Sequence, residues 1–305
     1  MQGPASAYQK RVKITMSDRI RLRTLLAEKG WNKSLRDGSP VSDRIQFDFA
    51  DAPKVTAEFK PMVRELAYDC GELAIVTYLQ ARAAGKPLVL LPVVVNGGFH
   101  HKSFAYNSAH GDLLLEMLPG KRIGVRTYSQ TTATWVRGIL QNDYGADMDK
   151  VNWVTFEDAH TAEYRDPANC QRAEPGKKLA DMLLAGEIDG GVMGSDMPAD
   201  PRLRTLIEDP EADAQAWAAK YDVYPINHMF VVKKELCERD PETVREIYRL
   251  LAAARAQHPA NFPLGFDGNW KALELISTYA HQQRLISQPV SVDELFSEAA
   301  AVLGR

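Results

Sequence analysis

The stretch from Lys121 to Gly145, KRIGVRTYSQTTATWVRGILQNDYG, contains the best-defined strand and helix of the chain. Its apolar and β-branched residues predict a strand over Ile123 to Tyr128, and Ser129 is a typical helix cap. The predicted helix has one apolar face, made of Trp135, Val136, Ile139 and Leu140. A buried strand followed by an amphipathic helix is the repeating unit of an α/β protein.

The same alternation of strands and helices continues on both sides of this unit. Apolar runs predict further strands at Val12–Met16, Ile45–Phe49, Leu88–Val95, Val151–Phe156, Ile188–Met193 and Val223–Val232. Apolar periodicity and caps predict helices after Ser17-Asp18 up to Gly30, from near Thr56, over Lys178–Ala185, after Asp240-Pro241, over Asn269–Arg284 and over Val292–Leu303. Leu73–Val76 fits a strand and the opening of a helix equally well.

The chain length of 305 residues suggests two domains. Two segments, Leu66–Glu72 and Glu187–Val192, resemble each other, and an internal duplication and a chance match explain them equally well. A duplication predicts two lobes, each an open mixed or parallel sheet flanked by helices. We expect lobe 1 to hold residues 1–105 plus 226–305, and lobe 2 to hold residues 106–225. Ligands of open sheets bind at the carboxyl ends of strands, so the cleft between the lobes is the predicted site.

Composition excludes several classes of protein. The 37 Lys and Arg residues do not exceed the 40 Asp and Glu residues, so nucleic acid is not an expected partner. The longest apolar run, Leu88–Val95, is too short for a membrane span, which needs about 20 residues. The first residues lack the apolar core of a secretory signal, which predicts a cytoplasmic protein with its three cysteines reduced.

Motifs for common cofactors are missing from the sequence. It contains no GxGxxG, GxxxxGK[ST] or GxSxG pattern, so we expect neither a nucleotide enzyme nor a serine hydrolase. The loop from Glu157 to His160 includes Asp158 and offers oxygen and nitrogen ligands, but it lacks a recognised metal spacing. We therefore expect no organic cofactor and treat Asp158 and His160 as secondary site residues in a solvated polar loop. A divalent ion shared by His160 and His101 is the open alternative, which no motif supports.

Five segments together resemble the 4,5-dihydroxyphthalate decarboxylase family. They are Asp69–Glu72, Phe99–Ser103, Gly124–Tyr128, Trp135–Leu140 and Ile226–His228. The resemblance spans residues 60–235 and is strongest over Gly124–Gly145. It implies a type II periplasmic-binding-protein-like fold and the decarboxylation of a hydroxylated aromatic di- or polycarboxylate. The chain departs from the family pattern at His100, where arginine is common, and at Arg126, where proline is common, so the ring substitution of the substrate stays open.

Such a decarboxylation needs a proton donor, because protonation of the ring carbon avoids a free aryl anion. Histidine is the usual donor near neutral pH, and the resemblance makes His101 and His228 the candidates. A histidine such as His228, in an apolar segment, is also commonly a hydrogen-bonded core residue. Glu72 is the third catalytic candidate, either orienting a histidine or acting as the acid itself; a structural charge at a helix start explains it equally well.

The helix start after the Ile123–Tyr128 strand is the predicted carboxylate site. Its free backbone N–H groups and hydroxyls suit an anion, and Arg126 at the strand end adds a cation. Tyr128 is expected to stack on an aromatic ring or to be a packed core residue. The full set of predicted substrate-binding residues is Arg126, Tyr128, Ser129, Gln130, Thr131, Thr132 and His100.

The sequence thus predicts a decarboxylase that closes on a small aromatic carboxylate, with no nucleic-acid or membrane partner. The alternative is a non-catalytic solute-binding protein that captures a small anionic or aromatic carboxylate for transport or sensing. The sequence leaves open whether the protein forms a homo-oligomer.

Overall fold

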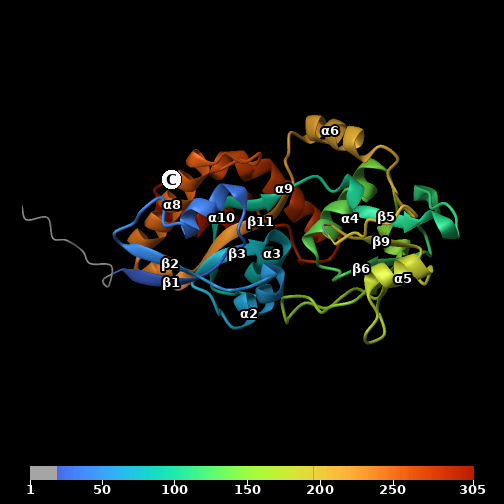
Figure 1. The fold of residues 1–305 in the computed structure, drawn as a ribbon, viewed down its shortest axis with the longest axis horizontal. Coiled ribbons are helices and arrows are strands. Elements are labelled where there is room, and N and C mark those ends of the chain that lie inside the picture. The colour runs from blue at the N-terminus through green and yellow to red at the C-terminus, as the bar shows by residue number, and fades with distance from the viewer. Residues whose placement is uncertain (1–18, 195) are drawn as a thin grey trace, which may run out of the picture.

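The computed structural model of the chain describes residues 19–194 and 196–305. Its strands form two separate sheets, one of five and one of six strands, which lie side by side along the long axis of the molecule (Figure 1). We call the part built on the five-stranded sheet the first lobe and the part built on the six-stranded sheet the second lobe. Each is an open, mixed α/β sheet flanked by helices, so the predicted fold class is confirmed.

The first-lobe sheet has the strand order β2-β1-β3-β11-β4. Its strands are β1 (Ile20–Leu25), β2 (Ile45–Phe49), β3 (Cys70–Ala74), β4 (Leu88–Gly97) and β11 (Ile226–Lys233). Strand β1 pairs in parallel with β2 and β3, whereas β11 runs antiparallel between β3 and β4. Strand β11 therefore pairs with a strand that lies nearly 130 residues earlier in the sequence, since Ile226 pairs with Gly97 of β4.

The second-lobe sheet has the order β10-β5-β9-β6-β7-β8. Its strands are β5 (Phe104–Asn107), β6 (Arg122–Val125), β7 (Asn152–Thr155), β8 (Cys170–Arg172), β9 (Gly190–Val192) and β10 (Leu203–Thr205). Strands β9, β6, β7 and β8 are parallel, and β5 runs antiparallel to β9 and β10. The carboxyl end of β6 leads directly into a helix, as the sequence predicts.

Helices cover both sheets (Figure 1). They are α1 (Lys33–Arg36), α2 (Phe59–Arg64), α3 (Ile75–Ala83), α4 (Thr131–Asp143), α5 (Leu179–Ala185), α6 (Pro210–Tyr221), α7 (Lys234–Arg239), α8 (Pro241–Gln257), α9 (Phe266–Gln282) and α10 (Val292–Leu303). Short 3₁₀ turns lie at Gly30–Asn32, Val55–Glu58, His101–Ser103, Ser108–His110, Leu115–Met117 and Met148–Lys150.

The chain passes from the first sheet to the second between β4 and β5, and returns between β10 and β11. Helix α9 packs closely on α4 of the second lobe. Gly138 of α4 permits this contact, because a Cβ at this position would lie 2.0 Å from Cδ2 of Tyr279 on α9. The C-terminal part of the chain thus contacts both lobes. Strand β5 of the second lobe begins at Phe104, one residue before the predicted boundary at residue 105. The division into 1–105 plus 226–305 and 106–225 stays a prediction.

The predicted helix between Ser17 and Gly30 is wrong. Residues Ile20–Leu25 form β1 instead, and Ile20 pairs with Ile45 of β2. The apolar residues that suggested a helix face also fit a strand, because Leu22 and the buried Thr24 alternate with exposed arginines. The predicted strand Val12–Met16 lies outside the described residues. Residues Leu73–Val76, which fitted both a strand and the opening of a helix, contain both: β3 ends at Ala74 and α3 begins at the next residue.

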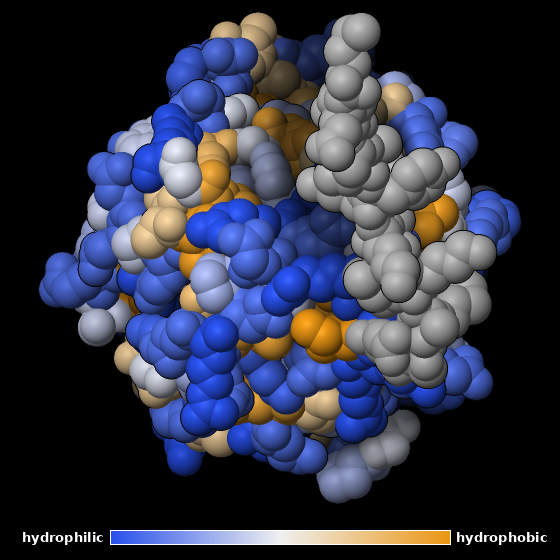
Figure 2. Space-filling model, turned by 90° about the vertical axis from the view of Figure 1, so that its left-hand side faces the viewer, coloured by the Kyte–Doolittle hydropathy of each residue, from blue (hydrophilic) through white to orange (hydrophobic). Residues whose placement is uncertain are grey.

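The end of the molecule beside β1 and β2 is mostly polar. Among the described residues that are visible in Figure 2, most side chains on this face are hydrophilic, with hydrophobic ones in patches between them. Of the large apolar side chains, Ile20 and Val41 are among the few exposed ones. Within residues 19–194 and 196–305, no helix has the length and apolar content needed to cross a membrane.

Candidate functional site

A cavity of about 540 Å³ lies between the two lobes. Its first-lobe wall comes from α2, the start of α3 and the ends of β4 and β11, and its second-lobe wall from the β6–α4 connection and the segments after β7 and β9. We call it the central cavity. Its polar lining consists of Lys54, Thr56, Thr77, Asn96, His100, Lys102, Ser103, Arg126, Gln130, Thr131, Thr132, His160, Asp196, Asn227 and His228.

A buried carboxylate holds one histidine of the central cavity. Antiparallel pairing sets His228 on β11 opposite Ala74, and Glu72 lies two residues before Ala74 on β3, on the same face of the sheet. The imidazole Nδ1 of His228 donates a hydrogen bond of 2.7 Å to Glu72 Oε2. The Glu72 side chain is inaccessible to solvent, whereas the ring of His228 lines the cavity. The structure therefore brings these two predicted residues together.

The residue before Glu72 explains how its carboxylate is fixed. Gly71 has φ +155°, and a Cβ at this position would lie 2.2 Å from the carbonyl oxygen of Leu25. Glycine thus lets β1 approach β3 closely, and just beyond β1 the backbone N–H of Ala27 donates to Glu72 Oε1 over 2.5 Å. Both carboxylate oxygens are therefore hydrogen-bonded, one to the backbone and one to His228.

A second histidine, His160, reaches the same cavity from the second lobe. The rings of His160 and His228 both pack edge-on against Phe59, with centroid distances of 5.5 and 5.1 Å. The Nδ1 of His160 shares a hydrogen bond of 2.8 Å with Thr77 Oγ1. Burial, aided by the nearby positive charge of Arg126, lowers the pKa of His160 from 6.5 to about 3. His160 is therefore a neutral hydrogen-bonding group at physiological pH.

His100 is the third histidine that lines the cavity. Its Nε2 shares a hydrogen bond of 2.7 Å with Oδ1 of Asn227, the neighbour of His228 on β11. Burial lowers the pKa of His100 from 6.5 to about 4, with a small opposing effect from Asn227. The predicted binding residue His100 is thus present in the site as a neutral imidazole.

Two helix N-termini meet at the central cavity, one from each lobe. The first turn of α3 contributes Thr77, and the start of α4 contributes Gln130, Thr131 and Thr132. Neither helix has a side-chain cap, and their starts are joined by a 3.3 Å hydrogen bond from the backbone N–H of Val76 to Thr131 Oγ1. Free N–H groups and two positive dipole ends make this part of the cavity an anion site.

Cations lie at the rim of the same cavity. Arg126 Nη1 bonds Glu157 Oε2 at 2.9 Å, and no hydrogen bond of its other guanidinium N–H groups is recorded among the described residues. Lys54 of the first lobe pairs with Asp196 of the second at 3.1 Å, and both residues line the cavity. The predicted binding residues Arg126, Gln130, Thr131 and Thr132 thus share one wall.

Four predicted site residues do not reach the central cavity. His101 is buried outside it, with its ring edge-on to Trp217 of α6 at 5.9 Å, so its predicted role as proton donor is not supported by its position. Tyr128 packs over the guanidinium of Arg137, 3.9 Å from ring centroid to Cζ, and is a core residue. Ser129 is buried one position before the actual N-cap of α4, and Asp158 pairs with Arg172 on the surface.

Other lining residues could not be identified from the sequence. Phe59 is buried, and its ring also contacts the rings of His160 and His228. Thr77 and Asn96 carry no local motif, and only the sheet and the lobe arrangement bring them to the site. Within the described part of the chain, no group of three or more His, Cys, Asp or Glu side chains is placed to hold a metal ion.

Comparison with known proteins gives two similar curated sequences. The chain is 32% identical to 4,5-dihydroxyphthalate decarboxylase of Comamonas testosteroni, in a 197-residue alignment that covers 58% of each chain. It is also 32% identical to the enzyme of the same name from Pseudomonas putida over 167 residues, covering 50% of this chain and 64% of the relative. The chain thus spans less than two thirds of either relative's length. No family model matches it.

Solved structures establish the fold. The alkanesulfonate-binding protein SsuA from Xanthomonas axonopodis pv. citri superposes with a TM-score of 0.54 at 16% identity, covering 91% of this chain and 97% of that one. A putative periplasmic sulfonate-binding protein from Methylobacillus flagellatus KT gives a TM-score of 0.50 at 11% identity, covering 94% of both chains. The protein therefore has the two-lobed fold of periplasmic solute-binding proteins, and its sequence resembles the 4,5-dihydroxyphthalate decarboxylases.

Proposed function

We propose that the protein is a carboxy-lyase that removes CO2 from a hydroxylated aromatic di- or polycarboxylate similar to 4,5-dihydroxyphthalate. The observation that carries the proposal is the Glu72–His228 pair, which faces a cavity with an anion site between the lobes. A buried carboxylate on one ring nitrogen fixes the orientation of the imidazole and leaves the other nitrogen to face the ligand, which suits a proton donor. The relatives named as decarboxylases support the same reaction.

In the proposed reaction, the Nε2–H of protonated His228 delivers a proton to the ring carbon that bears the carboxylate. A ring hydroxyl ortho or para to this carbon supplies electron density, so no organic cofactor is needed. The C–C bond then breaks, its electron pair restores the aromatic ring, and CO2 leaves. His228 is left neutral and takes its next proton from solvent. The helix starts and Arg126 bind the carboxylates, and the neutral His100 and His160 offer hydrogen bonds to hydroxyls.

The direct test is to incubate the purified chain with a panel of hydroxylated phthalates and measure CO2 release. We expect release from substrates with a hydroxyl ortho or para to a carboxylate, and none from phthalate itself. Tight binding without CO2 release from any compound would contradict the decarboxylase and support the solute-binding alternative, since the same cavity is able to capture an aromatic carboxylate without chemistry.

Arg126 and Thr132 are expected to contribute to carboxylate binding. Replacing Arg126 with glutamine removes a charged hydrogen bond worth about 1.5–3 kcal/mol, which raises the Kd about 10- to 150-fold. Thr132→Val removes a hydroxyl of the cavity wall with little change in shape, and we expect a smaller increase. Isothermal titration calorimetry with phthalate measures both. Arg122→Gln is the control, because Arg122 starts the same strand but bonds the carbonyl of Glu187 outside the cavity. Equal affinities in all four proteins would exclude the proposed anion site.

A further inference from the structure

A segment of the second lobe extends across to the first lobe. Residues 157–165, which we call the crossing segment, follow β7 and include His160 of the central cavity. The start of the segment is held in the second lobe, where the backbone N–H of Glu157 donates to the carbonyl of Arg126 over 2.8 Å. The middle of the segment contacts the first lobe, and the chain then returns to β8 of the second lobe.

Arg64 of α2 makes the most specific of these contacts. Its Nε donates to the carbonyl oxygen of His160, and its Nη2 donates to the carbonyl oxygen of Ala159, both over 2.8 Å. A planar guanidinium that bonds two successive carbonyls fixes the two peptide units on either side of the His160 Cα. The His160 side chain is then bonded to Thr77 and packed on Phe59, which are also first-lobe residues.

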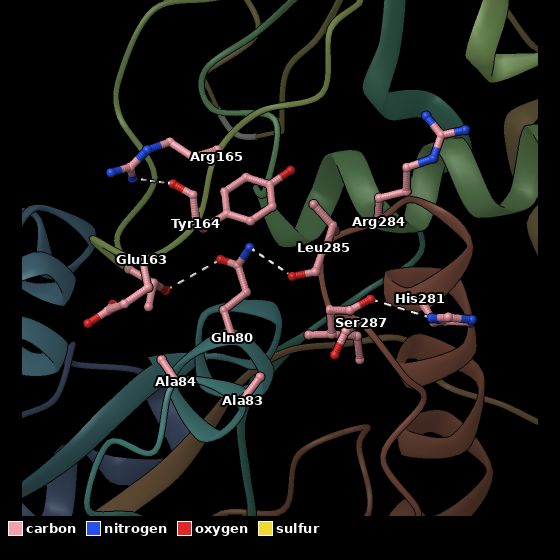
Figure 3. A pocket seen from close by; sticks show the side chains of 12 residues that line it. Gln80, Ala83, Ala84, Glu163, Tyr164, Arg165, His281, Arg284, Leu285 and Ser287 are labelled. Carbon is pink, nitrogen blue, oxygen red and sulfur yellow. Dashed lines mark hydrogen bonds between the residues drawn. The ribbon is translucent and has the colours of Figure 1, made fainter.

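A neighbouring cavity of about 450 Å³ shows how the segment continues (Figure 3). Here Gln80 of α3 accepts a 3.4 Å hydrogen bond from Thr161 and donates one of 3.2 Å to the carbonyl of Leu285. Lys86 pairs with Glu163 at 2.7 Å. Among the described residues, no hydrogen bond of the His160 ring to the second lobe is recorded, so its position in the cavity depends on the first lobe.

We propose that Arg64 of the first lobe is a positioning residue that places the His160 imidazole of the second lobe in the central cavity. The Nδ1 of His160 is engaged by Thr77, which leaves Nε2 for a hydrogen bond to the ligand. The role of this hydrogen bond in turnover depends on the proposed function. The placement of the ring by Arg64 does not depend on the proposed function, because it can be measured without a substrate.

The environment of His160 supplies a readout that needs no substrate. The groups that face the ring are the side chains of Phe59, Thr77 and the titratable His228, and the cations Arg126, Lys60 and Arg64. Desolvation is the main reason that the pKa of the ring lies far below 6.5, and the cations add to it. Release of the segment exposes the ring to water and raises its pKa toward the ordinary value.

The experiment is a histidine-ring NMR titration of the full chain between about pH 5 and 8. We expect His160, assigned with His160→Asn, not to titrate in the wild type and to titrate in Arg64→Ala. Arg64→Lys keeps the positive charge but cannot bond both carbonyls in the same way. Partial titration of His160 in this variant would therefore come from the loss of the backbone anchor and not from the loss of a positive charge. Arg165→Ala is the matched control, because Arg165 bonds only carbonyls of its own segment, those of Ala162 and Tyr164.

A His160 ring that stays untitrated in Arg64→Ala, with the fold intact by circular dichroism, would overturn the proposal. If Arg64→Ala does not fold, Arg64→Lys carries the test, because it removes the two-carbonyl geometry and keeps the charge. On an active preparation, we expect Arg64→Ala to lower kcat by up to about 100-fold with a smaller change in KM, and Arg165→Ala to change neither. Titration as expected without CO2 release would sustain the positioning role and refute the proposed function.

Discussion

Replacement of His228 by asparagine is expected to reduce CO2 release about 10²- to 10⁴-fold, the usual contribution of a general acid. Asparagine keeps the size and polarity of the site but has no proton to transfer to carbon. Glu72→Gln should give a loss in the same range, because the amide still accepts from Ala27 but no longer offers a negative charge to His228. Single-turnover rates under saturating substrate measure both effects on the chemical step.

The affinity for phthalate should change only modestly in these two variants, since the helix starts and Arg126 are untouched. His110→Asn is the matched control, because His110 is an exposed histidine outside the central cavity, and it should release CO2 at the wild-type rate. Wild-type turnover in His228→Asn would remove His228 as the proton donor. Losses of affinity as large as the losses of rate would indicate a binding role for the pair instead.

The second large effect concerns stability against acid. His100 and His160 have pKa values of about 4 and 3 in the folded protein, against 6.5 for a free histidine. Below pH 6.5 the unfolded chain therefore binds protons that the folded chain does not, and the free energy of unfolding falls as the pH is lowered. Each histidine contributes a slope of about 1.4 kcal/mol per pH unit, or about 2 kcal/mol at pH 5.

Urea denaturation at pH 7.5 and at pH 5 measures this loss. The double variant His100→Asn, His160→Asn lacks both titrating rings, so the difference between its two free energies should be smaller than that of the wild type by about 4 kcal/mol. His110→Asn should keep the wild-type difference, since its ring is exposed. An equal difference in the double variant and the wild type would show that these rings are protonated in the folded protein.

The sequence predicted those elements whose signal is local. The β6–α4 unit, β2, β4 and the last helices follow from apolar periodicity and caps, and the structure confirms them. Strand β1 was mistaken for a helix because its short apolar pattern fits both periods, and its pairing with β2 and β3 decides the outcome. Helix α6 was overlooked, although Asp209 caps it and Pro210 occupies its first turn, a recognisable start signal.

The candidate site was only partly predictable for the same reason. Glu72 and His228 are 156 residues apart, and only the antiparallel register of β3 and β11 places them on one face. His101 was predicted as a proton donor, but its ring packs against Trp217 of the overlooked α6. His160 was assigned to a solvated loop because nothing in its local sequence reveals that Arg64 and Thr77 hold it against the other lobe.

The two helices that begin side by side at the central cavity, one in each lobe, have a further consequence. Their starts are joined by the hydrogen bond between Val76 and Thr131, and each start carries the partial positive charge of a helix N-terminus. A carboxylate bound at these starts is therefore attracted by both lobes at once. A methyl ester of the same acid has a similar shape but no negative charge, so we expect it to lose this attraction.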